Sequence, residues 1–170
     1  MCSKFNKRIF VTGNAGSGKT TLAKHISTKL NIPFYSLDRI VWQPGWKTTP
    51  SVERKQLIID LLNKDEWVID GVSQDVLIKS NTVVFLDIPR HLCYIRLMRR
   101  NYRYLFKSRP ELPVNCPEIK IIGKLISIVW NFKRNVRPTI MNHINDSSNK
   151  SIFHIKSTNE LECLYKNILI

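Results

Sequence analysis

One stretch near the N-terminus, FVTGNAGSGKTT at 10–21, limits the fold more than any other feature of this 170-residue chain. It contains the spacing G-x-x-x-x-G-K-[ST], from Gly13 to Thr20, between a predicted strand and a predicted helix. Glycines let successive backbone N–H groups turn toward a phosphate, and the N-terminus of the following helix favours an anion there. We therefore predict a nucleotide-binding loop, and with it an α/β fold.

The residues expected to bind the nucleotide follow one another through the loop and into the helix. They are Gly13, Asn14, Ala15, Gly16, Ser17, Gly18, Lys19, Thr20 and Thr21. Lys19 is the expected catalytic cation of the loop, because a lysine at this position reaches the β- and γ-phosphates. The hydroxyl of Thr20 is expected to bind Mg²⁺. The sequence thus predicts ATP and Mg²⁺ as cofactors.

Five short apolar runs alternate with helix-like segments along the chain. The runs are Arg8–Thr12, Pro33–Leu37, Trp67–Ile69, Val83–Leu86 and Ile152–Ile155. Strands separated by helices pair in parallel, so this order predicts a three-layer α/β fold with helices on both faces of the sheet. Helices are expected at 19–29, 49–63, 89–104, 118–134 and 157–168, and loops at 107–118 and 142–151. We interpret 1–170 as one domain.

The chain contains 27 Lys and Arg against 13 Asp and Glu, a formal net charge of +14. Such an excess favours an anionic partner, which leaves nucleotides, nucleic acids and membrane surfaces open. No run reaches the roughly 18 apolar residues of a membrane span, and no signal-peptide pattern precedes the first strand. We therefore expect a cytoplasmic protein without a membrane partner. The four cysteines stand apart, so we expect neither a zinc site nor a structural disulfide.

Three kinds of protein use such a loop: guanine-nucleotide switches, translocating motors and kinases. A switch requires N-K-x-D after a strand, whereas NKDE at 63–66 ends in Glu and precedes a strand. A motor usually needs a larger chain. The kinase is favoured by residues 88–110, which contain no acidic residue and place on one helical face Arg96, Arg99, Arg100 and Arg103. Guanidinium groups suit the charge that develops during phosphoryl transfer.

The segment FLDIPRHLCYIRLMRR at 85–100 resembles the sequence that leads into the lid of the adenylate kinase family. The resemblance implies that Arg96 lies against the adenine and that Arg100 contacts the ATP phosphates, where we expect it to be catalytic. The segment WVIDG resembles a strand motif of that family, and it implies that Asp70 orders the magnesium waters.

Two further carboxylates are expected near the magnesium. Asp38 matches another acidic position of the adenylate kinase pattern, and Asp87 ends the predicted strand VVFLD. The residues predicted to lie at the magnesium are therefore Thr20, Asp38, Asp70 and Asp87. Asp38 has two alternative roles: it is the general base if the acceptor is a hydroxyl, and a metal-side residue if the acceptor is already a phosphate.

A wider resemblance is to a small bacterial group, the DNA topology modulation proteins or FlaR-related kinases. It is carried by LDRIVWQPGWK at 37–47, WVIDGVSQD at 67–75, FLDIPR at 85–90 and RPELPVNCPE at 109–118. It implies a nucleoside-monophosphate-kinase-like P-loop fold with five parallel strands in the order 2-3-1-4-5. A small helical lid is expected at about 100–137. Arg109 is then an expected catalytic lid residue, with Arg134 and Arg137 as weaker candidates.

The expected acceptor site departs from the adenylate kinase pattern. Val41 and Gln74 stand where that family has the two arginines that hold the acceptor's phosphate, so AMP is not favoured as the acceptor. Trp42 and Trp46 are expected either to sandwich a ring of the acceptor or to pack the loop onto the sheet. The predicted acceptor-binding residues are Asp38, Arg39, Trp42, Trp46 and Gln74.

These features together predict an ATP-dependent kinase that phosphorylates a nucleotide, a nucleoside or a related small metabolite. The alternative is an ATP-binding regulator associated with nucleic acid, whose basic helix would contact phosphates. We favour it less, because the aromatic motifs of RNA-binding modules are absent from the sequence. A monomer and a homodimer are both compatible with these features.

Overall fold

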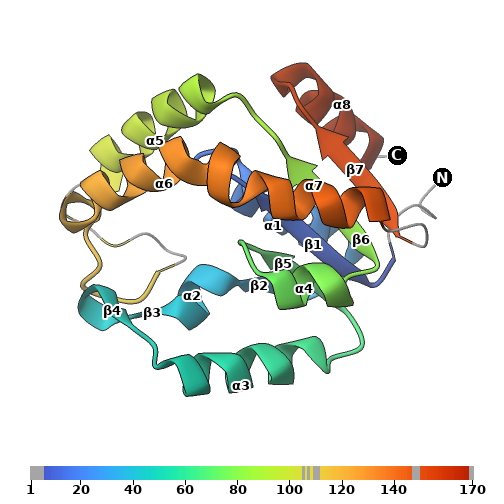
Figure 1. Cartoon of the computed structure of the whole chain (residues 1–170), viewed down its shortest axis with the longest axis horizontal. Coiled ribbons are helices and arrows are strands. Elements are labelled where there is room, and N and C mark those ends of the chain that lie inside the picture. The colour runs from blue at the N-terminus through green and yellow to red at the C-terminus, as the bar shows by residue number, and fades with distance from the viewer. Residues whose placement is uncertain (1–5, 105, 107, 109–111, 147–149, 169–170) are drawn as a thin grey trace.

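The computed structural model describes residues 6–104, 106, 108, 112–146 and 150–168 (Figure 1). Its main sheet has five parallel strands in the order β2-β5-β1-β6-β7. The strands are β1 (Arg8–Gly13), β2 (Phe34–Ser36), β5 (Trp67–Asp70), β6 (Thr82–Leu86) and β7 (Ser151–Ile155). Counted among these five strands alone, the order is 2-3-1-4-5. The predicted sheet and its strand order are therefore confirmed.

The helices and the small second sheet fill the connections between these strands. The helices are α1 (Lys19–Leu30), α2 (Leu37–Val41), α3 (Ser51–Leu62), α4 (Gln74–Lys79), α5 (Arg90–Tyr104), α6 (Ile122–Asn135), α7 (Arg137–Asp146) and α8 (Thr158–Ile168). Single 3-10 turns lie at η2 (Pro44–Trp46) and η3 (Glu118–Lys120). A two-stranded antiparallel sheet pairs β3 (Trp42–Gln43) with β4 (Lys47–Thr48).

Two hydrophobic cores lie on the two faces of the main sheet. On one face, Ile9 and Val11 of β1 pack with buried residues of α1, α5 and α8. On the other, Phe10 of β1 and Ile69 of β5 pack with buried residues of α3, α4 and α7. Successive side chains of β1 thus point to opposite faces of the sheet and are buried on both, as in a strand covered by helices on each side. The predicted three layers are thus present, and α6 contributes to both cores.

One predicted boundary near the C-terminus differs from the structure. The predicted loop at 142–151 is wrong at its start, because α7 continues to Asp146. Ile140 is buried in the second core, and Met141 and Ile144 pack against it, so an apolar stripe stabilises the helix. Figure 1 shows α6 and α7 following each other nearly end to end.

An altered form of the capping box begins α8. The hydroxyl of Ser157 accepts a hydrogen bond of 3.2 Å from the backbone N–H of Glu160. The Glu160 carboxylate accepts from the backbone N–H of Lys156, at 2.8 Å, and not from that of Ser157. Both bonds still satisfy donors near the helix start.

Candidate active site

The predicted phosphate-binding loop lies between the central strand β1 and α1. Gly16 has a φ of 79°, in the left-handed region. A Cβ at this position would lie 2.4 Å from the main-chain oxygen of Cys93 in α5, so only glycine fits without a shift of the backbone. The loop therefore curls tightly against α5, with the N-terminus of α1 behind it. This is the arrangement in which backbone N–H groups bind a phosphate.

Lys19 begins α1 and lines the cavity in front of the loop. Its ammonium group donates a hydrogen bond of 3.0 Å to the main-chain oxygen of Asn14. Burial lowers the pKa of Lys19, while the nearby carboxylates of Asp70 and Asp38 oppose that shift. The ammonium group of Lys19 thus lies beside the loop and close to the carboxylates of Asp70 and Asp38.

Thr20 and Asp70 meet at the carboxyl edge of the sheet. Asp70 ends β5 directly beside β1, and its carboxylate accepts a hydrogen bond from the Thr20 hydroxyl. Burial raises the pKa of Asp70, although the Thr20 hydrogen bond and the Lys19 charge act in the opposite direction. A hydroxyl and a carboxylate side by side are oxygen donors of the kind that Mg²⁺ prefers.

No group of three or more His, Cys, Asp and Glu side chains in the described part of the chain is arranged to hold a metal. Mg²⁺ commonly binds through one or two protein oxygens, water and the phosphates of a nucleotide. Thr20 and Asp70, with Asp38 nearby, are the residues that would hold it.

The side chain of Asn14 links the loop to α6, a role that sequence reasoning missed. Its amide nitrogen donates a hydrogen bond of 3.0 Å to the main-chain oxygen of Val129. Its amide oxygen accepts one of 2.8 Å from the backbone N–H of Ala15. The side chain is buried and does not line the cavity. Nothing in the local sequence indicates this contact, because the partners are 115 residues apart.

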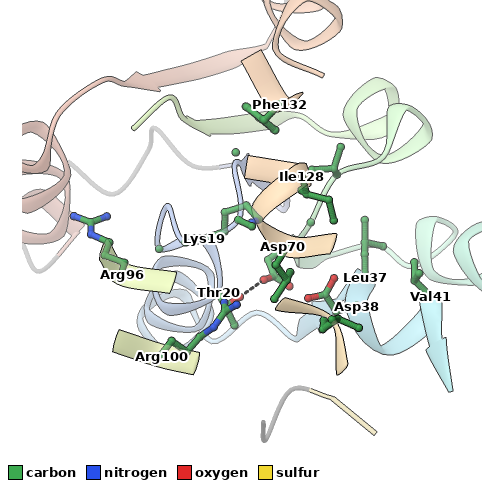
Figure 2. A pocket seen from close by; sticks show the side chains of 18 of the residues that line it. Lys19, Thr20, Leu37, Asp38, Val41, Asp70, Arg96, Arg100, Ile128 and Phe132 are labelled. Atoms are coloured by element: carbon green, nitrogen blue, oxygen red, sulfur yellow. Dashed lines mark hydrogen bonds between the residues drawn. The ribbon is translucent and has the colours of Figure 1, made fainter. Parts of the chain in front are cut away.

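Two predicted arginines of α5 reach the same region (Figure 2). The guanidinium of Arg96 donates a hydrogen bond of 3.0 Å to the main-chain oxygen of Ser17, in the loop. Arg100 lies one helical turn further on, and its guanidinium is 3.8 Å from the carboxylate of the fully buried Glu118. Both arginines line the cavity, so α5 supplies positive charge beside the loop.

One cavity of about 660 Å³ collects most of the predicted site residues. We call its two parts the nucleotide half and the acceptor half, by the elements that line them. The nucleotide half comprises Gly13, Ala15, Gly16, Gly18, Lys19, Thr20, Thr21, Lys24, Asp70, Arg96, Arg100 and Tyr104. The acceptor half comprises Leu37, Asp38, Val41, Trp42, Trp46, Gly71, Val72, Ile121, Lys124, Leu125, Ile128, Phe132 and Val136.

The two tryptophans of the acceptor half do not face each other as a sandwich would require. Their ring centroids are 5.2 Å apart and their planes stand at 85°. The ring nitrogen of Trp46 donates a hydrogen bond of 2.9 Å to the main-chain oxygen of Pro117. The ammonium of Lys124 lies over the ring of Trp42, 4.6 Å from its centroid. Both rings therefore form one wall of the cavity, and of the two predicted alternatives their edge-to-face contact does not match the sandwich.

Several predicted site residues lie away from this cavity. Asp87 is bound by Arg137, at 2.8 Å, and by the ring nitrogen of His154, at 3.1 Å. We therefore remove Asp87 from the magnesium set and Arg137 from the lid candidates, because this ion pair engages both side chains. Ser17, Arg39 and Gln74 do not line the cavity. Arg109 lies outside the described residues.

Burial and hydrogen bonding act against each other at Asp87. Burial alone would raise its pKa, but the hydrogen bonds from Arg137 and His154 outweigh it, so the pKa lies below its usual value. Arg134, the other lid candidate, donates a hydrogen bond of 3.3 Å to the adjacent Asn135.

No protein-family model matches the chain. The shikimate kinase of Bacteroides fragilis is 32% identical over 109 residues, which cover 53% of this chain and 61% of that protein. The shikimate kinase of Aquifex aeolicus is 31% identical over 119 residues, covering 59% of this chain and 71% of that protein. The chain belongs to the P-loop kinase family that includes these shikimate kinases. The DNA topology modulation group is not shown by these matches.

Two solved kinase structures share the fold of this chain. A shikimate kinase from Acinetobacter baumannii, in complex with shikimate, superposes with a TM-score of 0.58 at 18% identity and covers 95% of this chain and 89% of that one. A deoxyadenosine kinase from M. mycoides, with bound dATP, gives a TM-score of 0.55 at 15% identity, covering 95% and 99%. At these identities the likeness concerns the fold alone.

Among the described residues, no helix combines the length and the apolar composition needed to cross a membrane.

Proposed function

We propose that this protein is a kinase that transfers the γ-phosphate of ATP to a hydroxyl group of a small molecule. The observation that carries the proposal is the continuity of the cavity. Its nucleotide half contains the glycine loop, Lys19 and Thr20, and its acceptor half contains Asp38 and a largely apolar wall. Phosphoryl transfer depends mainly on positioning and charge stabilisation, and both are available where the two halves meet.

The proposed roles follow from these positions. Lys19 and Arg100 neutralise charge on the transferred group, and Arg96 orders the loop through Ser17. Thr20 and Asp70 hold Mg²⁺, which supplies charge neutralisation of the phosphates when bound. Asp38 accepts the proton of the acceptor hydroxyl. The acceptor oxygen forms a bond to the γ-phosphorus as the bond to the β-phosphate bridging oxygen breaks, which gives ADP and a phosphate monoester.

The acceptor proposed here is a hydroxyl-bearing small molecule, and nucleosides and shikimate are the first candidates. The shikimate kinase relatives and the deoxyadenosine kinase fold support this class. Nucleoside monophosphates are less suited, because Val41 and Gln74 replace the two arginines that would hold the acceptor's phosphate. A cytoplasmic location, where ATP and Mg²⁺ are abundant, and a monomeric or homodimeric state complete the proposal.

The experiment is an acceptor panel with ATP and Mg²⁺, in which mass spectrometry detects the phosphorylated product. We expect Lys19→Ala to lower the rate on the order of 10²-fold or more, because the charge on the transferred group loses its nearest ammonium. The matched control is Lys55→Ala, at an exposed position of α3, which should leave the rate unchanged. Tight binding of ATP without product from any acceptor would contradict the proposal.

A further inference from the structure

Two consecutive residues ahead of α6, Pro117 and Glu118, contact both halves of the cavity. The main-chain oxygen of Pro117 accepts the 2.9 Å hydrogen bond from the ring nitrogen of Trp46, in the acceptor half. The carboxylate of Glu118 lies 3.8 Å from the guanidinium of Arg100, in the nucleotide half. One short segment therefore joins a wall of the acceptor half to an arginine beside the phosphate-binding loop.

The contact between Glu118 and Arg100 lies at the boundary of the protein interior. The Glu118 side chain is fully buried, whereas that of Arg100 keeps 27% of its surface exposed. A buried carboxylate is stabilised by a neighbouring cation, so this attraction holds the guanidinium in place. Burial is the main cause that lowers the pKa of Lys19, and the charge of Arg100 acts in the same direction. Arg100 is therefore close enough to influence both the buried carboxylate and the lysine of the loop.

The same segment is fastened to the acceptor half by further bonds. The backbone N–H of Ile121 donates a 3.0 Å hydrogen bond to the main-chain oxygen of Glu118, and Ile121 lines the acceptor half. The thiol of Cys116 donates one of 3.6 Å to the main-chain oxygen of Gln43, in β3. A displacement of Glu118 would therefore be passed to the β3–β4 ribbon and to the start of α6.

We propose that Glu118 is a positioning residue, which orients Arg100 for phosphoryl transfer and transmits the binding of a nucleoside triphosphate to Trp46. Phosphates at the loop attract Arg100, and the Glu118 carboxylate follows the guanidinium, because a buried charge that loses its partner is strongly unfavourable. The 3-10 turn η3, which begins at Glu118, then shifts the wall that faces the acceptor. The effect on rate rests on the proposed kinase function, whereas the link between the two halves is measured without turnover.

The ring N–H of Trp46 reports on this link. The chain has four tryptophans, so the ¹H–¹⁵N spectrum of the full chain contains four ring signals, and Trp46→Phe identifies that of Trp46. We expect a non-hydrolysable ATP analogue with Mg²⁺ to shift this signal, and ADP with Mg²⁺ to shift it less, because ADP lacks the γ-phosphate that Arg100 is proposed to meet. A signal that stays in place while the glycine signals of the loop move, or that moves equally with both nucleotides, would overturn the inference.

Glu118→Gln removes the charge and keeps the length of the side chain. The Trp46 signal should then stay in place while the glycine signals of the loop still respond to the analogue. The matched control is Glu66→Gln, which removes a partly exposed carboxylate 3.7 Å from the ammonium of Lys7 and should keep the wild-type shift. A full shift in Glu118→Gln would mean that the nucleotide acts on Trp46 by another route. If Glu118→Gln does not fold, the wild-type comparison of the two nucleotides still decides.

Steady-state kinetics separates positioning from a purely structural role. Glu118→Gln should lower kcat on the order of tenfold and change the KM for ATP by less than about threefold, because a misplaced Arg100 affects the transition state more than the bound nucleotide. A raised KM with unchanged kcat would contradict this role.

The outcomes distinguish this inference from the proposed function. A Trp46 shift without phosphate transfer to any acceptor refutes the kinase proposal alone, and transfer without the shift refutes this inference alone. Absence of nucleotide binding would refute both.

Discussion

The side-chain amide of Asn14 donates a 3.0 Å hydrogen bond to the main-chain oxygen of Val129, and this bond joins the phosphate-binding loop to α6. The same residue's main-chain oxygen accepts from Lys19. The helix on the other side of the bond carries Ile128 and Phe132, which line the acceptor half. One buried asparagine therefore contacts both the group expected to meet ATP and the helix expected to meet the acceptor.

Asn14→Ala should loosen α6 without removing the loop. We expect the free energy of unfolding to fall by about 1–2 kcal/mol, because a buried hydrogen bond is lost. The KM for the acceptor should rise more than the Kd for the nucleotide, since the acceptor half loses its fixed wall. Urea unfolding and steady-state kinetics measure the two effects.

Asn131→Ala is the matched control for Asn14→Ala. Asn131 makes a similar 3.0 Å bond from its amide nitrogen to a main-chain oxygen, that of Ser127, but this bond lies within α6 and is exposed to solvent. Its removal should alter neither stability nor kinetics measurably. Equal effects of the two substitutions would mean that the Asn14 bond has no special role.

Gly16→Ala should abolish tight nucleotide binding. The new Cβ would lie 2.4 Å from the Cys93 main-chain oxygen, and the φ of 79° is unfavourable for alanine. We expect a stability loss of about 1–3 kcal/mol together with the loss of ADP binding in calorimetry.

Gly123→Ala is the opposite case, because its Cβ would meet nothing within 4 Å. In a helix it should stabilise the protein by about 0.5–1 kcal/mol and leave ADP binding intact.

The Asp87–Arg137 pair should make stability depend on pH in the acid range. The pKa of Asp87 is lower in the folded chain than its ordinary value of 3.8, so the folded state holds the proton less tightly than the unfolded state. Its contribution is therefore present above pH 3.8 and is lost as pH falls through the lowered pKa. Asp87→Asn should cost about 1–3 kcal/mol at pH 7, and the difference from wild type should shrink below pH 4.

Urea unfolding from pH 7 to pH 3 measures this effect on wild type and variant. Asp60→Asn, which changes an exposed carboxylate on α3, should show no comparable difference. A wild-type advantage that stays constant down to pH 3 would argue against the lowered pKa.

Magnesium-dependent nucleotide binding should weaken at acid pH through Asp70. Burial raises the pKa of this carboxyl above its ordinary 3.8, so it takes up a proton at a higher pH than an exposed aspartate does. Only the ionised form can hold Mg²⁺, so the affinity for ADP with Mg²⁺ should fall as pH approaches the raised pKa. The Asp70→Asn variant should bind ADP with Mg²⁺ weakly at every pH and should not show this fall in affinity at acid pH. Calorimetry compares wild type and variant at the same pH, so that protonation of the nucleotide affects both alike. The control is Asp75→Asn, at an exposed position of α4.

The five strands and α1 followed from the sequence because their signals are local, whereas the strand order was implied by the family resemblance. Each strand is a short apolar run, and the glycine loop marks the start of α1 directly. The helix α7 was missed because its apolar positions, 140, 141 and 144, are set among polar residues. The error then affected the site: Asp87 was expected at a metal because its partner Arg137 begins that unpredicted helix.

The acceptor half shows where sequence reasoning fails for a different reason. The cavity is lined by Ile121, just before α6, and by Leu125, Ile128 and Phe132 of α6, spaced four, three and four residues apart. Leu125 and Phe132 also belong to the hydrophobic cores, so periodicity alone does not show which apolar residues of the helix line a cavity. Contacts such as Lys124 with Trp42 join segments distant in the chain, so no local pattern indicates them.

The strand that carries the phosphate-binding loop has a neighbour on each side, β5 and β6, whereas the tryptophans of the acceptor half belong to the separate β3–β4 ribbon and its turn. The residues of that ribbon belong to neither hydrophobic core. Replacements there can therefore alter the wall that faces the acceptor without changing a core residue or a residue of the phosphate-binding loop.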